Sequence, residues 1–246
     1  MRARVCGLGV SFFRRPALRA VDLALPARGL VFVMGKSGVG KTTFLRALNR
    51  LNEEFPGCET SGEAWLDLGD GLENIYATAK SVTEIRRRVG MVFQTPAILP
   101  VSVRKNLVLP LRLAAGRRES EIDGLTEQAL RAAKLWHEVA DRLSAPASSL
   151  SAGQQQRLCL ARALSLEPAV LLLDEPTASL DPSAAGAIEE LLVELSRSRP
   201  LVVTSHNPDQ AARLADHCLI LVESGSHKVF ARSEMPCGKD LSALLV

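Results

Sequence analysis

Residues 35–42 read Gly-Lys-Ser-Gly-Val-Gly-Lys-Thr, a spacing of glycines, lysine and hydroxyl that suits phosphate binding. Glycines let successive backbone N–H groups converge on phosphate oxygens, and the start of a helix adds positive potential. Lys41 would reach the β- and γ-phosphates of a nucleotide, with its ammonium in solvent, and the Thr42 hydroxyl would ligate Mg²⁺. The alternative is a glycine-rich turn that binds nothing; the apolar run before the loop and the helical pattern after it favour phosphate binding.

A second constellation stands at Asp174 and Glu175, directly after an apolar run at 169–173. A buried strand that ends in a carboxylate would place Asp174 beside the phosphate loop, where it can hold the Mg²⁺ shell. Glu175, one residue further on, can polarise an attacking water as a general base. An Asp-Glu pair before Pro176 is also ordinary at a surface turn, so the hydrolytic interpretation depends on its pairing with the phosphate loop.

The elements that must position these residues follow from hydrophobic periodicity. Alternation at 21–25 predicts a half-buried strand, and the continuous apolar run 29–34 predicts a strand buried on both faces. After the phosphate loop, four residues share one helical face: Phe44, Leu45, Leu48 and Leu51. Further strands are predicted at 64–68, within an edge hairpin, and at 89–93, 169–174, 201–204 and 218–222, with a helical apolar stripe at 188–195. Buried strands alternating with helices predict an α/β fold with a mostly parallel sheet.

A third motif indicates a family. Residues 150–154 read Leu-Ser-Ala-Gly-Gln and continue as Gln-Gln-Arg to 157. This string resembles the signature motif of the ABC ATPases, normally Leu-Ser-Gly-Gly-Gln. Other marks of that family occur in its order over nearly the whole chain: Gln94 after a strand, Ser-Leu-Asp at 179–181 and His206 after another strand. The chain is therefore identified as resembling the ATP-binding subunits of ABC transporters.

The resemblance implies roles that single residues would not establish. Gln94 matches the glutamine that couples Mg²⁺ to a helical lobe, Asp181 belongs to a loop that crosses a dimer interface, and His206 matches the switch histidine that contacts the γ-phosphate. Phe12 lies where the family places an aromatic ring under adenine, although Phe13 is adjacent and either ring could belong to the core. Taken alone, Gln94 and His206 would be ordinary polar residues at strand ends.

The signature residues have a physical task in this family. Ser151 is expected to cap a helix beginning at Ala152, and such a terminus attracts an anion. In the family it faces the nucleotide held by the opposite subunit, so two chains enclose two ATP molecules. Ala152 replaces the first glycine: its methyl either crowds the phosphate and slows hydrolysis or points away and is neutral. Gly153, the more exacting position, is kept.

The candidate residues fall into three overlapping groups. The catalytic candidates are Lys41, Glu175 and His206, and the metal candidates are Thr42, Gln94 and Asp174. The candidates for binding ATP are Phe12, Gly35, Lys36, Ser37, Gly38, Val39, Gly40, Lys41, Thr42, Thr43, Gln94, Ser151, Ala152, Gly153, Gln154 and Asp181.

Residues 95–150 interrupt the alternation of strands and helices, because they are rich in Leu, Ala and Arg and contain no strand-like run. With the resemblance, we expect a P-loop NTPase core of the ABC ATPase type. Its sheet would be mostly parallel, with an antiparallel β part and this helical lobe inserted. The chain would then be one domain, 1–246, with its core at 1–94 and 151–246.

Composition excludes several classes of function. The 246 residues carry 30 basic and 27 acidic side chains, a net charge of +3 that is too small to indicate nucleic-acid binding. The five cysteines are scattered without a Cys-x-x-Cys pair, which favours reduced thiols over a zinc site or disulfides. No stretch approaches the roughly 18 apolar residues of a membrane span. The resemblance then implies a peripheral place at the cytoplasmic face of the inner membrane, through transmembrane permease partners.

The likeness is greatest to the ATPase of bacterial phosphate importers. It rests on 49–53, 73–77, 135–143 and 84–94, and on stretches around 154–159 and 206–213, whereas 95–100 and the C-terminal tail depart from it. It implies a homodimer, permease subunits and, indirectly, a solute-binding protein. Another small solute stays open as the alternative. A non-transport ABC ATPase would need a coiled-coil insertion or tandem cassettes, and a P-loop kinase would lack the signature.

Overall fold

The structure, a computed structural model, describes residues 3–223 and 225–245. Within these residues a six-stranded sheet has the order β10-β9-β3-β8-β7-β6. Its strands are β3 (Gly29–Met34), β6 (Val89–Val92), β7 (Val170–Asp174), β8 (Pro200–Thr204), β9 (His217–Leu221) and β10 (His227–Ala231). All neighbours pair in parallel except β9 and β10. The predicted α/β fold with a mostly parallel sheet is confirmed.

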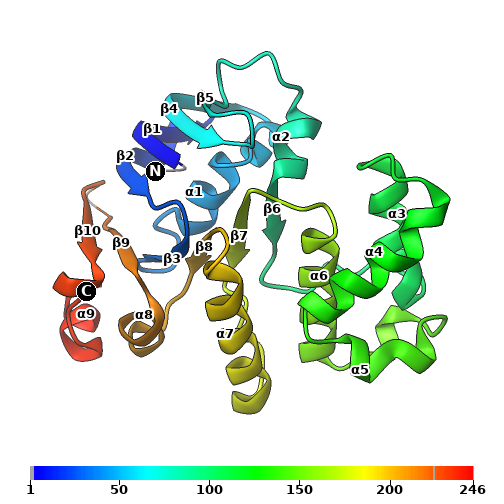
Figure 1. Ribbon diagram of the computed structural model, residues 1–246. Helices are drawn as coiled ribbons and strands as arrows, with labels where there is room; N and C mark the ends of the chain where they lie inside the picture. Colours follow the sequence, from blue (N-terminus) through cyan, green and yellow to red (C-terminus); the bar gives the residue numbers. More distant parts are fainter. Residues whose placement is uncertain (1–2, 224, 246) are drawn as a thin grey trace.

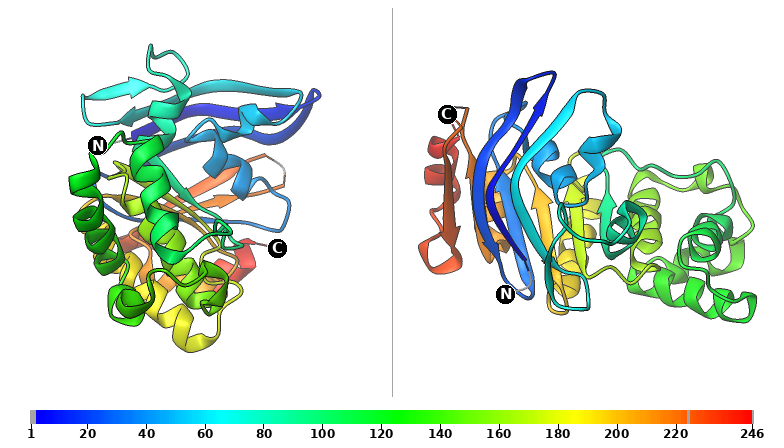
Figure 2. Two further views of the ribbon diagram at one scale, coloured as in Figure 1. Left: turned by 90° about the vertical axis from the view of Figure 1, so that its right-hand side faces the viewer. Right: turned by 90° about the horizontal axis from the view of Figure 1, so that it is seen from above.

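A second, antiparallel sheet lies over one face of the first (Figures 1 and 2). It has the order β2-β1-β4-β5 and contains β1 (Ala3–Phe12), β2 (Arg15–Leu25), β4 (Cys58–Asp67) and β5 (Leu72–Asn74). Val21, Leu23 and Leu25 are buried while their neighbours are exposed, as the alternation predicts. The predicted edge hairpin is also confirmed, because β4 and β5 pair at one side of this sheet.

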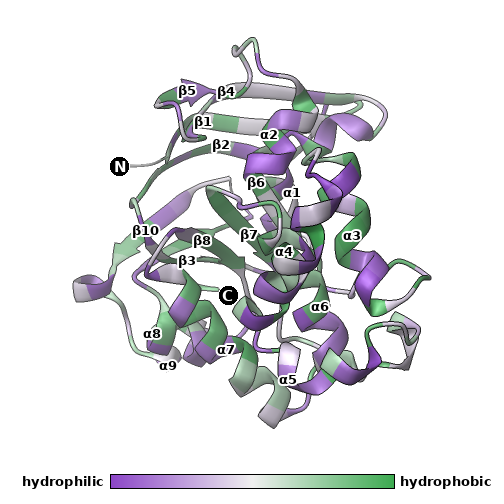
Figure 3. Ribbon diagram, turned by 45° about the vertical axis from the view of Figure 1, so that its right-hand side comes forward, coloured by the Kyte–Doolittle hydropathy of each residue, from purple (hydrophilic) through white to green (hydrophobic). Residues whose placement is uncertain are grey.

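The parallel strands are buried on both faces, which explains their unbroken apolar runs. Leu30, Phe32 and Met34 of β3 belong to a core shared with the helices, whereas Val31 and Val33 belong to the core beneath the antiparallel sheet. Figure 3 shows these strands as a hydrophobic interior, with hydrophilic residues along the outer helices. The sheet is thus the middle layer, and the loops at its carboxyl edge are left free for chemistry.

The helix after the phosphate loop is shorter than predicted. α1 spans Lys41–Ala47, and Arg50 then adopts a left-handed conformation with φ 59 before the 3₁₀ helix η1 (Leu51–Glu54). Phe44, Leu45 and Leu48 are buried as expected. Leu51, however, does not continue the helix. The turn is held by side chains, since Asn52 Nδ2 donates to the Thr43 carbonyl at 2.9 Å.

Helices fill the segment 95–150, which lies on the far side of the molecule from β9 and β10 (Figure 1). α2 (Val82–Arg88) precedes it; α3 (Val103–Leu113), α4 (Glu119–Ala132), α5 (Trp136–Val139), η2 (Ala140–Arg142) and η3 (Ala147–Ser149) lie within it; α6 (Ala152–Leu164) follows. One isolated bridge, Ser102 with Pro146, is its only β pairing among the described residues. Leu107 and Leu130 join the core together with α6, whereas Val108, Leu111 and Ile122 form a small cluster of their own. The division into a core and a lobe stays a prediction.

The remaining helices cover the other face of the main sheet. α7 (Pro182–Ser196) buries Ile188, Leu191 and Leu192, which confirms the predicted stripe, and α8 (Pro208–Leu214) follows β8. After β10, for which the sequence offered no motif, come η4 (Arg232–Glu234) and α9 (Gly238–Leu244). In the described part of the chain no helix is long and apolar enough to cross a membrane.

Candidate functional site

The phosphate loop, residues 35–42, runs from the end of β3 into α1. Two of its glycines have left-handed backbone conformations and no space for a side chain. A Cβ at Gly35 (φ +151) would lie 2.7 Å from the Leu221 carbonyl oxygen, and one at Gly40 (φ +108) would lie 2.5 Å from the Ala17 carbonyl oxygen. Only glycine takes such conformations readily. The loop is therefore held closely between β9 and β2.

Lys41 is buried, contrary to the expectation that its ammonium lies in solvent. Lys41 as a whole residue is only 8% exposed. Nζ donates hydrogen bonds to the carbonyl oxygens of Gly35 at 2.9 Å and Lys36 at 3.1 Å. The expectation was wrong because the loop folds back over the side chain and offers the ammonium carbonyl acceptors. The positive charge is thereby fixed inside the loop.

Thr42, Asp174 and Thr204 form a hydrogen-bonded group beside the loop. The Thr42 hydroxyl donates to Asp174 Oδ2 at 2.8 Å, and the Thr204 hydroxyl donates to Asp174 Oδ1 at 2.7 Å. Thr204 Oγ1 also accepts the Glu175 backbone N–H at 2.9 Å. β3, β7 and β8 are neighbours in the sheet, so their carboxyl ends bring these residues together. Sequence reasoning missed Thr204; its signal was a hydroxyl that ends an apolar strand.

Glu175 is the centre of a second polar group. Its Oε2 accepts from Gln94 Nε2 at 3.3 Å and lies 3.0 Å from His206 Nδ1. The Glu175 side chain is 16% exposed and that of His206 is 64% exposed, so the group opens to solvent on the histidine side. Glu175 also has a left-handed backbone, φ 43, which turns the chain sharply after β7. The structure thus gathers three residues that the sequence singled out separately.

The donor atoms of this region fit a magnesium ion. Mg²⁺ prefers hard oxygen ligands such as hydroxyl, carboxylate and amide oxygens. Thr42 and Asp174 supply the first two and already lie within hydrogen-bond distance of each other. Gln94, which has the amide, reaches the same edge through Glu175. The candidate metal ligands are therefore grouped around one place.

The signature residues lie at the start of α6. Ser151 caps this helix as predicted: its Oγ accepts from Gln154 N at 3.3 Å, and Gln154 Oε1 accepts from Ser151 N at 3.0 Å. Gly153 is buried against α7, where a Cβ would lie 3.0 Å from that of Ala184. Asp181 caps α7 by accepting the N–H groups of residues 183 and 184 at 3.0 Å. The signature and the Asp181 loop are thus packed together.

Comparison with known families decides what this arrangement belongs to. A family model described as ABC transporter matches residues 18–178, which include the phosphate loop, Asp174 and the signature. The chain belongs to the ABC transporter family of ATPases. Membership implies that it binds ATP, couples ATP hydrolysis to transport and acts with membrane permeases.

Curated relatives of this ABC ATPase are 44% to 46% identical to it over 81% or more of its chain. It is 44% identical over 216 residues to the phosphate import ATP-binding protein PstB of Streptomyces coelicolor, a match that covers 87% of this chain and 82% of the relative. PstB of Rubrobacter xylanophilus is 44% identical, with 82% of this chain and 69% of the relative covered. PstB 1 of Mycobacterium bovis is 46% identical, with 81% and 76% covered.

Solved structures of similar shape include a part of an ABC transporter complex and an ATP-binding cassette. CbiO1 of Clostridium perfringens, part of the ABC transporter complex cbiONQ, is 26% identical with a TM-score of 0.80, and the match covers 98% of this chain and 90% of that one. The cassette MJ0796, in a dimeric post-hydrolysis state bound to ADP and Pi, is 26% identical with a TM-score of 0.76, covering 94% and 98%. The ABC ATPase fold is therefore confirmed.

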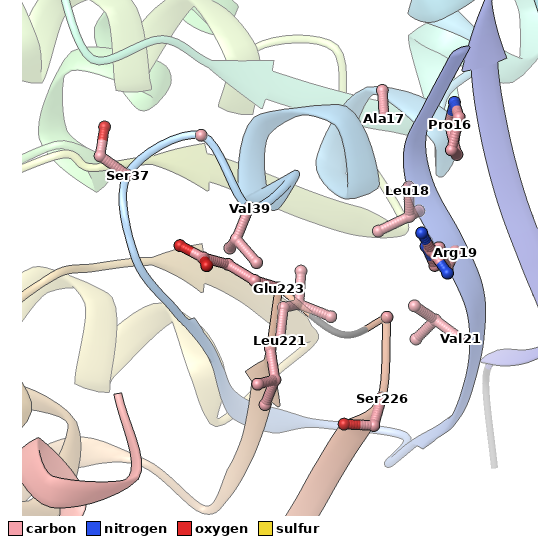
Figure 4. Close-up of a pocket in the computed structure, with 13 residues that line it drawn as sticks. Pro16, Ala17, Leu18, Arg19, Val21, Ser37, Val39, Leu221, Glu223 and Ser226 are labelled. Carbon is pink, nitrogen blue, oxygen red and sulfur yellow. The ribbon is translucent and has the colours of Figure 1, made fainter. Parts of the chain in front are cut away.

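A cavity of 330 Å³ borders the phosphate loop of the ATPase (Figure 4). Its walls are β2, residues 37–39 of the loop and the end of β9, with Arg19, Val39 and Glu223 around the space. Phe12 is not among the described residues that line it. That ring is half-buried and meets Phe55 edge-to-face, with 6.3 Å between centroids. The adenine role of Phe12 stays a prediction.

Proposed function

We propose that this ABC ATPase is the ATP-hydrolysing subunit of a phosphate importer. The proposal for the solute rests on the three relatives named as phosphate import proteins, each at least 44% identical. The proposal for the chemistry rests on one observation: Glu175 contacts both Gln94 and His206 at the edge where Thr42 meets Asp174. Import of another small solute is the alternative.

We propose that residues 35–43 hold the ATP phosphates. Their backbone N–H groups would surround the phosphate oxygens, and Lys41 would exchange its carbonyl acceptors for the β- and γ-phosphates. Thr42, Asp174 and Gln94 would hold Mg²⁺. The ion, when bound, offsets the negative charge that builds up on the phosphate oxygens.

Glu175 is assigned as the general base. The two side-chain contacts of Glu175 in the described residues, with Gln94 and His206, both go to Oε2, which leaves Oε1 for the attacking water. The buried Thr204 hydroxyl fixes the Glu175 backbone and so the direction of its side chain. His206 is mostly exposed and would reach the γ-phosphate from the solvent side. A positioned base of this kind contributes roughly 10²- to 10⁴-fold in rate.

We propose that the working unit is a homodimer. Within one chain the signature residues contact α5 and α7, so the phosphate they serve would be that of a second copy. The dimeric neighbour MJ0796 bound to ADP and Pi supports this arrangement. Ser151, Ala152, Gly153, Gln154 and Asp181 would then complete the site of the opposite chain. ATP closes the dimer because it contacts both chains only in the closed state.

The membrane role requires partners. The helical segment 95–150, linked to the site through Gln94, would pass the motion of the dimer to transmembrane permease subunits. The ATPase would sit peripherally at the cytoplasmic face of the inner membrane, and a solute-binding protein would deliver phosphate from the other side. These partners are proposed from the family and from the relatives' printed function.

Uptake of radiolabelled phosphate tests the solute. Cells that depend on this chain and its permeases should accumulate phosphate, and cells with Glu175→Gln should not. Excess unlabelled phosphate should compete, whereas excess sulfate should not. Uptake that is unaffected by the variant, or equal competition by sulfate, would contradict the assignment of phosphate.

A further inference from the structure

Glu138 of α5 binds two side chains of the signature helix at once. Its Oε2 accepts from Gln154 Nε2 at 2.7 Å, and its Oε1 accepts from Arg157 Nη1 at 2.5 Å. Arg157 also donates to the Lys134 carbonyl at 2.8 Å, just before α5. Gln154 and Arg157 are one turn apart on α6, so the carboxylate spans one face of the helix.

Both the oxygen and the nitrogen of the Gln154 amide take part in contacts. Its oxygen accepts from Ser151 N and closes the capping box, while its nitrogen donates to Glu138. The Glu138 carboxylate accepts the bonds from Gln154 and Arg157, and charge-assisted bonds of this type are the stronger ones. The orientation of the first turn of α6, with the backbone of Ala152 and Gly153, is therefore fixed from outside the helix by α5.

Glu138 is suited to remain charged while it does this. Burial acts to raise the pKa of Glu138, but the hydrogen bonds from Arg157 and Gln154 outweigh it and leave the pKa below its ordinary value. The Glu138 side chain is 38% exposed and that of Arg157 is 16% exposed. The pair is thus partly sheltered, unlike the exposed Glu127–Arg131 pair on α4.

We propose that Glu138 is a positioning residue for hydrolysis of the ATP bound to the opposite subunit. Through Gln154 it holds the start of the signature helix at the angle at which its N–H groups meet that nucleotide. The inference rests on the proposed homodimer. It assigns to Glu138 an effect in trans: the residue belongs to one chain and acts on the site of the other.

The test begins with single variants. Glu138→Ala removes the bonds to Gln154 and Arg157. Glu138→Gln keeps the shape of the side chain but removes the negative charge that faces Arg157. ATP binding to the variant's own phosphate loop is measured by titration of dilute protein that also carries Glu175→Gln, which prevents hydrolysis. The affinity should match that of Glu175→Gln alone. Steady-state ATPase activity should fall at least about tenfold for Glu138→Ala, because small misplacements in a site cost that much. Glu127→Ala is the matched control and should leave activity unchanged.

Mixing experiments separate positioning in trans from damage to the fold. In the first mixture, a limiting amount of Glu138→Ala is combined with an excess of Glu175→Gln. The intact phosphate loop of Glu138→Ala then lies opposite the intact signature of Glu175→Gln. ATP cleavage should reach the rate given by the same limiting amount of wild type in that excess. Limiting wild type with an excess of the double variant, Glu138→Ala with Glu175→Gln, should be slow. Equal loss in both mixtures, or unchanged steady-state activity, would overturn the inference. No cleavage by limiting wild type in excess Glu175→Gln would instead overturn the proposed dimer, and the inference with it.

Discussion

The Thr204 hydroxyl donates to Asp174 Oδ1 at 2.7 Å and, through the same oxygen, accepts the backbone N–H of Glu175 at 2.9 Å. One buried side chain from β8 thereby orients both acidic residues at the end of β7. Asp174, the candidate metal ligand, and Glu175, the candidate base, are adjacent in sequence. Their side chains point in different directions because Thr204 fixes the turn between them.

Replacement of Thr204 by valine should therefore impair hydrolysis and stability together. The variant leaves the Glu175 N–H without its acceptor, which costs about 2 kcal/mol for a buried group. Turnover should fall roughly 10- to 100-fold, as for other residues that orient metal ligands. Thr126→Val is the control, because the buried Thr126 hydroxyl has no hydrogen-bond partner in the described chain. Chemical denaturation and ATPase assays measure both effects; equal results for the two variants would contradict the role of Thr204.

Glu175→Gln should bind ATP yet hydrolyse it at least ~10²-fold more slowly, since a positioned base contributes that much. The amide keeps the shape of the side chain and its place beside Gln94 and His206, so the fold should not change. The variant should accumulate as an ATP-bound dimer in size-exclusion chromatography. Glu190→Gln, on the exposed face of α7, serves as the control. Wild-type turnover by Glu175→Gln would remove it as the base.

Lys41→Ala should abolish ATP binding or turnover while the chain stays folded. The lost hydrogen bonds to Gly35 and Lys36 are local, and α1 tolerates alanine, so the cost to folding should be about 1 kcal/mol. Titration with ATP and circular dichroism check the two parts. The exposed Lys239 of α9 supplies the control, Lys239→Ala, which should behave as wild type. ATP affinity and turnover that are both unchanged in Lys41→Ala would contradict the phosphate-loop assignment.

The two positions after Ser151 should respond differently to the same methyl group. Ala152 is exposed, and its N–H serves an anion as well as that of glycine, so Ala152→Gly should leave the ATPase rate unchanged at every protein concentration. Gly153→Ala would bring a Cβ to 3.0 Å from Ala184, so it should cost about 1 kcal/mol and lower turnover.

The measurement for this pair is the ATPase rate against protein concentration. A rise in Ala152→Gly, limited to concentrations at which dimers form, would show that the natural methyl crowds the partner's nucleotide. A Gly153→Ala variant as active and as stable as wild type would show that α7 can move away from the signature helix.

Burial should make Cys218 the least reactive thiol. Its environment raises the pKa to about 12, because the thiolate cannot be solvated there. The thiolate is the reactive form, so at pH 8 an alkylating reagent should modify the exposed Cys237 and spare Cys218. Mass spectrometry after timed alkylation checks the order; early labelling of Cys218 in folded protein would contradict it.

The folded state binds the Cys218 thiol proton more tightly than the unfolded state does. The contribution of Cys218 to stability is therefore full below its unfolded pKa and is lost as the pH rises towards 12.

The sequence alone determined the family and the main strands, and it named most residues of the candidate site. Short motifs such as 35–42 and 150–157 are contiguous, and their chemistry depends on the local backbone and the residue types. They can therefore be recognised from the sequence without a structure. The unbroken apolar runs of the parallel strands likewise follow from burial on both faces. Ser151 as a helix cap was predictable for the same reason: its partner, Gln154, is three residues away.

Only the tertiary structure decided contacts between distant segments. Thr204 meets Asp174 across 30 residues, and Glu138 meets Gln154 across 16, because neighbouring strands and packed helices bring them together. No local pattern reports such a meeting. The burial of Lys41 was decided in the same way, since the close packing of Gly40 on β2 and of Gly35 on β9 fixes the path by which the loop folds over the ammonium. The residues could be predicted from local sequence chemistry, whereas the orientation of their side chains depends on packing between distant segments.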